Sequence, residues 1–268
     1  MFVAMLVLCG AWVINAPAAA AAAPRYYLSL GDSLAFGFQR AKVGSDAGAA
    51  AFTTGYSDVL AARLEHGDQP LTLVNYGCPG ESTISFRTGG CPWTASPLHD
   101  PYAGSQREAA LAFLAANPGR VDLVTVSLWG NDATAFIASC AGNVQCIQQN
   151  APAAIATIAA RLGAELAEIR RAAPDAQLVV LGAYDVNAGH FDLTHPLVAS
   201  LNLALADVAH TARAEFANPF PVFNPPGDTG AALCPLTGLC TNGDVHPSDA
   251  GYRALANVIA AQLRPGQS

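Results

Sequence analysis

Short β-rich runs alternate with longer helical runs along most of this chain, and this alternation constrains the fold more than any other feature. The predicted strands are residues 26–30, 71–76, 121–128, 177–181 and 221–223. The predicted helices are residues 57–65, with Ser57 as N-cap, and residues 105–116, 153–172, 196–216 and 248–263. This order requires right-handed crossovers, so the sequence predicts an α/β fold with a parallel sheet of about five strands and helices on both faces.

Composition excludes several functional classes. The chain has 268 residues, 52% of them hydrophobic and 12% charged, which is typical of a folded domain with a large core. Its net charge of −7 argues against nucleic-acid partners, because phosphate binding needs clustered Lys and Arg. Lys42 is the only lysine and no two glycines have G-x-G spacing, so neither a phosphate-binding loop nor a dinucleotide fingerprint is expected.

Residues 1–23 have the pattern of a secretory signal. They carry no charge and consist of an apolar run, residues 2–14, followed by a small-residue zone. A membrane anchor is the alternative, but the 14 residues before Asn15 are fewer than the ~20 that a spanning helix needs. We therefore expect a secreted, extracellular protein with no stable membrane anchor, in which residues 24–268 form one domain and a monomer.

Cysteine usage agrees with secretion. The chain has seven cysteines, and Cys9 lies in the predicted signal, which leaves an even number in the mature chain. Six cysteines allow 15 connectivities. Each near-neighbour pair brackets a Gly/Pro-rich or polar loop, so we predict the disulfides Cys78–Cys91, Cys140–Cys146 and Cys234–Cys240. Neither C-x-x-C nor H-x-x-x-H spacing occurs, so no metal site is predicted.

Polar clusters follow three predicted strands and precede the last helix. Functional sites in parallel sheets lie beyond the carboxyl ends of the strands, where these clusters would meet. The four clusters are Gly31-Asp32-Ser33-Leu34, residues 75–80, Gly130-Asn131-Asp132 and Asp244-Val245-His246-Pro247.

Acyl transfer gives each cluster a chemical role. Ser33 would be the nucleophile, which needs a base to take its proton, and His246 would be that base. Ser33 could instead be an ordinary N-cap serine, and His246 a surface histidine before a helix. His195, also followed by proline, is the one rival base.

The remaining two clusters could stabilise an oxyanion. The main-chain N–H groups of Ser33 and Gly80 and the amide of Asn131 can point at one oxygen, and each such donor is typically worth ~10²–10³ in turnover. Taken singly, Gly80 and Asn131 are also common turn residues.

The four clusters, in this order, resemble the four blocks of the SGNH (GDSL) hydrolases. The matching residues are Gly31-Asp32-Ser33-Leu34, Gly80 in an N-x-G-x-x-G context, Gly130-Asn131-Asp132, and His246-Pro247 followed by Gly251-Tyr252. The resemblance implies a flavodoxin-like three-layer α/β/α fold and hydrolysis of carboxylic esters without metal or cofactor. It also implies that Ser33 is the nucleophile and His246 the base, and that Ser33, Gly80 and Asn131 form the oxyanion hole.

The sequence departs from the family pattern at two places. Gly130 directly precedes Asn131, whereas the family has one variable residue between them. The family usually has Asp three residues before the histidine, but that position is Gly243 here and the carboxylate is Asp244. Three groups could orient His246: Asp244, if the freedom of Gly243 absorbs the shift, a main-chain carbonyl, or another carboxylate such as Asp228.

Aromatic residues near the four clusters are the candidate substrate contacts. Five aromatic residues near the blocks could form apolar walls for an acyl or aryl group, although they could equally pack in the core: Phe36, Phe38, Phe86, Trp93 and Trp129. Of these, Phe36, Trp93 and Trp129 are the predicted substrate contacts. We expect a small-molecule or lipid-like ester substrate for an esterase or lipase. A carbohydrate deacetylase or acyltransferase using the same site is a second reading, and a binding module whose displaced aspartate marks catalytic decay is a third.

Overall fold

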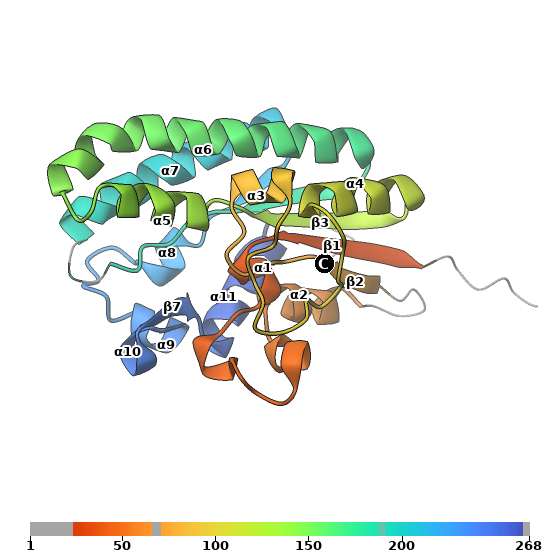
Figure 1. The fold of residues 1–268 in the computed structure, drawn as a ribbon, viewed down its shortest axis with the longest axis horizontal. Coiled ribbons are helices and arrows are strands. Elements are labelled where there is room, and N and C mark those ends of the chain that lie inside the picture. Colours follow the sequence, from red (N-terminus) through yellow and green to blue (C-terminus); the bar gives the residue numbers. More distant parts are fainter. Residues whose placement is uncertain (1–23, 66–70, 188, 190, 265–268) are drawn as a thin grey trace, which may run out of the picture.

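A five-stranded parallel sheet forms the centre of the molecule (Figure 1). The computed structural model describes residues 24–65, 71–187, 189 and 191–264, so the predicted signal lies outside the described residues. The strand order is β2-β1-β3-β4-β5. The strands are β1 (Arg25–Gly31), β2 (Leu71–Asn75), β3 (Val121–Ser127), β4 (Gln177–Leu181) and β5 (Glu215–Ala217).

Helices cover both faces of the sheet, as predicted, and give a three-layer α/β/α fold (Figure 1). The helices that pack on one face are α4 (Gln106–Ala116), α6 (Val144–Ala172) and α7 (Phe191–Thr211), with α3 (Thr83–Thr88) and α5 (Gly130–Ser139) beside them. Those on the other face are α1 (Ser33–Phe36), α2 (Tyr56–Leu64) and α11 (Asp249–Ala260).

Side-chain alternation along the strands divides the core in two. Leu28, Val124 and Val180 pack under α4, α6 and α7, whereas Tyr27 and Val179 pack under α2 and α11. All five of these side chains are fully buried. Burial on both faces explains why the strands are near-continuous apolar runs in the sequence.

The remaining elements form the loops around the sheet. They are two 3₁₀ turns (Arg40–Lys42 and Gly48–Phe52), the short helices α8 (Phe220–Phe223), α9 (Leu233–Leu236) and α10 (Leu239–Asn242), and the strands β6 (Thr237–Gly238) and β7 (Asp244–Pro247). Strands β6 and β7 pair antiparallel apart from the main sheet.

Proline positions account for most differences from the predicted elements. The predicted strand at 221–223 is wrong, because these residues belong to α8, and proline is well tolerated in the first turn of a helix. The fifth strand is instead β5, which occupies the end of the predicted helix 196–216. Helices α6 and α7 contain Pro152 and Pro196 and begin before them, whereas the predicted helices start at or after these prolines.

Two further corrections concern the N-cap of α2 and the presence of α5. The predicted N-cap Ser57 is a buried residue of α2 whose hydroxyl bonds the Ser29 hydroxyl at 2.6 Å, and the N-cap is Gly55. Helix α5 has no counterpart among the predicted elements, because Gly130-Asn131-Asp132 has the composition of a turn at the end of a strand.

Gly31, where β1 ends, is packed directly against the neighbouring strand. It pairs in register with Ser127 of β3 and has φ +132°. A Cβ atom at this position would lie 2.0 Å from the carbonyl oxygen of Ser127. Only glycine therefore fits where the chain leaves the sheet.

We expect Gly31→Ala to lower the free energy of unfolding by more than about 3 kcal/mol, because it combines an unfavourable φ with a clash against backbone. Urea unfolding measures the effect. Gly44→Ala is the matched control: Gly44 also has positive φ, +80°, but a Cβ atom there would meet no other atom within 4 Å, so the cost should be about 1–2 kcal/mol. Equal losses in the two variants would contradict the packing argument.

Candidate active site

The turn after β1 presents Ser33 at the carboxyl edge of the sheet. Gly31 ends the strand, and Asp32 caps the short helix α1, of which Ser33 is the first residue. The Asp32 carboxylate accepts a hydrogen bond from the N–H of Leu34 at 2.9 Å, and the Asp32 N–H donates to the carbonyl of Ser127 at 3.0 Å. Both ends of the turn are thus anchored, while Ser33 itself stays half-exposed.

His246 lies directly against Ser33, although 213 residues separate them in the chain. Its Nε2 is 2.9 Å from the Ser33 hydroxyl oxygen, and its Nδ1 is 2.6 Å from Oδ1 of Asp244. In the tautomer with the proton on Nδ1, the imidazole donates to Asp244 and accepts from Ser33. That is the arrangement in which histidine can take a proton from a serine hydroxyl.

The shifted aspartate, rather than a main-chain carbonyl or Asp228, lies at Nδ1 of His246. Gly243 adopts a left-handed conformation with φ +70°, and this turn brings the Asp244 side chain to the imidazole. Asp228 instead accepts hydrogen bonds from the N–H groups of Gly230 and Ala232.

Asp244 is also held by the chain that follows α1. Its Oδ2 accepts the N–H of Arg40 at 2.7 Å, and the side chain is buried. Burial would raise the pKa of the Asp244 carboxyl, but the hydrogen bonds from His246 and Arg40 outweigh it and lower the pKa. The carboxylate is therefore ionised at neutral pH.

Asp32 has the opposite electrostatic character. It is 2% exposed, and this burial raises its pKa to about 6, against the lowering effects of the Leu34 N–H and of His246. Two carboxyl groups near one histidine thus have pKa values that are shifted in opposite directions.

Gly80 is held in a compact loop next to the serine turn. It has φ +90°, and a Cβ atom there would lie 2.7 Å from Cγ of Pro92. The preceding Cys78 donates its N–H to the carbonyl of Gly31 at 3.0 Å. This bond ties the Gly80 loop to the residue that begins the turn toward Ser33.

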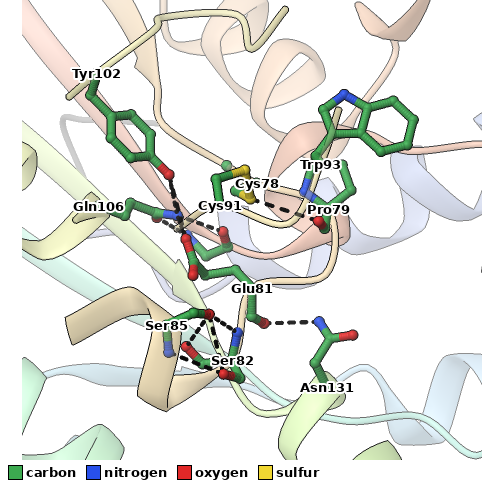
Figure 2. The surroundings of a disulfide bond; sticks show 12 residues. Cys78, Pro79, Glu81, Ser82, Ser85, Cys91, Trp93, Tyr102, Gln106 and Asn131 are labelled. Atoms are coloured by element: carbon green, nitrogen blue, oxygen red, sulfur yellow. Dashed lines mark hydrogen bonds between the residues drawn. A yellow bond between two sulfur atoms is a disulfide. The ribbon is translucent and has the colours of Figure 1, made fainter. Parts of the chain in front are cut away.

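Asn131 lies in the first turn of α5 and points toward the same loop. Its amide nitrogen donates to the main-chain carbonyl of Glu81 at 2.8 Å, as Figure 2 shows. The amide carries two N–H groups, so this bond leaves the second for a substrate oxygen. The neighbouring Asp132 accepts the N–H and the hydroxyl of Thr83 at 2.8 and 2.6 Å, which fixes α5 against the start of α3.

The structure contains disulfides at the three predicted pairs. Cys78–Cys91 closes the loop that contains Gly80 (Figure 2). Cys140–Cys146 joins the end of α5 to the start of α6, and Cys234–Cys240 joins α9 to α10 just before the segment that carries Asp244 and His246. Two of the three therefore brace segments of the site that have few sheet hydrogen bonds.

The three aromatic residues predicted as substrate contacts occupy different surroundings. Phe36 is fully buried and packs its ring against Phe52, Trp93 and His99, so it supports the site from within the core. Trp93 is half-buried beside it. Trp129 is also half-buried, donates its indole N–H to the carbonyl of Leu181 at 3.0 Å and packs against both halves of the core.

Phe38, which is not among those three residues, packs its ring against the imidazole. This half-buried ring contacts His246, with ring centroids 4.5 Å apart, and Trp93, with centroids 5.5 Å apart. Phe38 and Trp93 thus form an apolar surface next to His246. Phe38 is among the aromatic residues that the sequence places near the clusters, but not among the three predicted substrate contacts.

The rival His195 belongs to a different cluster. Its Nδ1 is 2.8 Å from the carboxylate of Asp185, which is fully buried, and its ring packs on Phe220 at 5.0 Å. Asp185 also accepts the N–H of Asn187 at 2.9 Å. This cluster follows β4 and is separate from the hydrogen bonds that join Ser33, His246 and Asp244.

Within the described part of the chain, no group of three or more His, Cys, Asp or Glu side chains is arranged to hold a metal ion. Across the same residues, no helix combines the length and apolar character required to cross a bilayer.

Comparison with solved structures gives a consistent fold. An extracellular lipase from Streptomyces rimosus superposes with a TM-score of 0.63 at 21% identity, covering 89% of this chain and 100% of the other. Phospholipase A1 from Streptomyces albidoflavus NA297 follows with 0.61 at 18% identity, covering 90% and 100%. An acetylxylan esterase from Geobacillus stearothermophilus gives 0.58 at 17%, covering 89% and 93%.

Sequence comparison adds the family. None of the curated proteins matches this chain. The model of the GDSL-like lipase/acylhydrolase family matches residues 29–254, which include all four polar clusters. The chain therefore belongs to the GDSL-like lipase/acylhydrolase family, whose ester chemistry agrees with the serine, histidine and carboxylate grouped at the edge of its sheet.

Proposed function

We propose that this protein is a secreted carboxylic ester hydrolase, an esterase or lipase that works through an acyl-enzyme on Ser33. The observation that carries the proposal is the unbroken run of hydrogen bonds from the Ser33 hydroxyl through His246 to Asp244. Family membership supports ester hydrolysis as the reaction. The disulfides support an oxidising location, in line with removal of residues 1–23 as a secretory signal.

The proposed reaction has two halves. Ser33 Oγ attacks the ester carbonyl carbon while its proton passes to Nε2 of His246, and the ionised Asp244 stabilises the imidazolium. The N–H groups of Ser33 and Gly80 and the amide of Asn131 would bind the oxyanion. His246 then protonates the departing alcohol. Water, activated by the same imidazole, attacks the acyl-enzyme and releases the acid.

The substrate is proposed to be a small or lipid-like ester that binds as an uncharged group. The half-buried surface of Phe38 and Trp93 beside His246 offers apolar contact to an acyl or aryl group. We further propose that the protein acts as a monomer, without cofactor, nucleic acid or membrane anchor. Its net charge of −7 is consistent with a partner other than nucleic acid.

Carbohydrate deacetylation is the second candidate, and the likeness to an acetylxylan esterase favours it over a non-catalytic binding role. Ester hydrolysis and deacetylation would use the same acyl-enzyme. Rates on acetylated xylan and on a chain-length series of aryl esters distinguish them, because a deacetylase should accept acetyl groups alone.

We expect Ser33→Ala to abolish hydrolysis of p-nitrophenyl esters and labelling by a fluorophosphonate probe, since both need the nucleophile. Ser200→Ala, on the exposed side of α7, is the control and should retain full activity. Hydrolysis that persists in Ser33→Ala would end the proposal. Absence of labelling in the unaltered protein would favour a decayed binding module.

We expect Asp244→Ala to lower kcat by about 10²–10⁴-fold, because an imidazole without its carboxylate loses its orientation and its charge partner. Asp228→Asn, which changes the carboxylate that does not reach His246, should stay within about twofold. A decrease under tenfold in Asp244→Ala would mean that a main-chain carbonyl suffices to orient His246.

The raised pKa of Asp32 predicts a pH-dependent stability. Between its ordinary value of 3.8 and about 6, the folded chain binds a proton that the unfolded chain has lost, so this group's contribution to stability decreases as pH rises through that window. From pH 4 to pH 6.5, Asp32→Asn should therefore gain up to about 3 kcal/mol relative to the unaltered protein in urea unfolding. Asp46→Asn, in an exposed loop, is the control. Parallel stability curves for Asp32→Asn and the unaltered protein would contradict this assignment.

A further inference from the structure

A buried hydrogen-bond network connects three segments of the proposed site, and Glu81 and Gln106 lie at its centre (Figure 2). Glu81 directly follows Gly80, and Gln106 is the first residue of α4. Both side chains are 1% exposed. The resemblance of the four polar clusters to a family assigns neither residue a role.

The side chain of Gln106 forms hydrogen bonds with both main-chain polar groups of Gly31. Its Oε1 accepts the Gly31 N–H at 2.6 Å, and its Nε2 donates to the Gly31 carbonyl at 2.9 Å. Gly31 lies two residues before Ser33, so this paired contact sets where the nucleophile turn begins. A helix residue that bonds both main-chain groups of one distant glycine restricts the orientation of the peptides on either side.

Glu81 connects Gln106 to Asn131 of the proposed oxyanion hole. Its carboxyl Oε2 accepts from Gln106 Nε2 at 3.0 Å and from the Tyr102 hydroxyl at 3.4 Å. Its main-chain carbonyl accepts the amide of Asn131 at 2.8 Å. The side chain of Glu81 therefore bonds to Gln106, which holds the start of the Ser33 turn. Its main-chain carbonyl bonds to Asn131, immediately beside Gly80.

The surroundings of the carboxyl group set it apart from an ordinary surface glutamate. Its second oxygen, Oε1, is buried and makes no hydrogen bond with any residue in the described part of the chain. The donors to Oε2, Gln106 and Tyr102, are neutral groups, and burial raises the pKa of the Glu81 carboxyl.

We propose that Glu81 is a positioning residue: through Gln106 and through Asn131 it sets the oxyanion donors at a defined distance from Ser33. The inference rests on the proposed roles of Ser33 and Asn131. Glu81 itself touches no reacting atom. Its effect should therefore appear in kcat rather than in KM, because an oxyanion hole binds the transition state more strongly than the substrate.

The test compares Glu81→Ala and Glu81→Gln in kcat, KM and urea unfolding, with a p-nitrophenyl ester as substrate. Glu81→Ala should lower kcat by about 10–100-fold with KM changed less than about threefold. Glu81→Gln keeps an oxygen that can accept from Gln106 and should stay within about threefold. A kcat for Glu81→Ala within about threefold of the unaltered protein, or an equal loss in Glu81→Gln, would overturn the proposal.

A matched control separates positioning from loss of a buried carboxylate in general. Glu165 of α6 is also 1% exposed and pairs with Arg87 at 2.7 Å, outside this network. Glu165→Ala should lower stability because it leaves Arg87 without this partner, yet kcat should stay within about twofold. A loss of kcat equal to that of Glu81→Ala would show that the effect is general destabilisation.

A double-mutant cycle tests the route of the effect. In a Gln106→Met background, Glu81→Ala should lower kcat by less than about threefold further, because the side-chain hydrogen bond between Glu81 and Gln106 is already absent. Full additivity would overturn the proposal. If Glu81→Ala does not fold, Glu81→Met replaces it in the same comparisons, since it removes the same side-chain hydrogen bond while conserving side-chain length.

The outcome for Ser33→Ala keeps the two proposals distinguishable. If Ser33→Ala is inactive while Glu81→Ala is fully active, the hydrolase proposal stands and only the role of Glu81 is wrong. If Ser33→Ala retains hydrolysis, the hydrolase proposal is itself wrong, whatever Glu81 does.

Discussion

The close approach of Gly31 to Ser127 is the constraint on which the rest of the site depends. At this point β1 stops pairing with β3 and turns toward Ser33, and the space beside the glycine is already filled by the Ser127 carbonyl. The main chain of Gly31 then serves as an anchor for two other segments, through Cys78 and Gln106. Polar main-chain groups that leave a sheet must find new partners when buried, and here those partners come from the Gly80 loop and from the start of α4.

The loops of the site lack the regular hydrogen bonds of the sheet and are braced by other means. Cys78–Cys91 and Pro92 hold the Gly80 loop, and Cys234–Cys240 lies just before the segment with Asp244 and His246. The Asp132–Thr83 hydrogen bonds hold α5 against α3. A hydrolytic site needs its groups held to a fraction of an ångström, and cross-links between loops provide that more directly than the distant core.

Much of the architecture follows from local patterns. The predicted strand over residues 177–181 matches β4 residue for residue, because a short apolar run bounded by polar residues is typical of a strand buried on both faces. The predicted helix 105–116 begins at Ser105, which is indeed the N-cap of α4, with Glu108 completing a capping box. Helix starts near Pro152 and Pro196 and the strand β5 do not follow from such patterns, because tertiary packing and strand pairing override the local signals there.

The sequence alone is enough to identify the family, the layered fold and the serine, glycine, asparagine and histidine of the four clusters. The reason is that residue types, their order and their apolar periodicity are properties of the chain itself and do not depend on packing. The folded structure was needed to establish that Asp244 reaches His246, that Phe38 rather than Phe36 contacts the imidazole, and that Glu81 and Gln106 join the site segments. Such contacts depend on the φ of Gly243 and on side chains far apart in the chain, and neither leaves a periodic trace in the sequence.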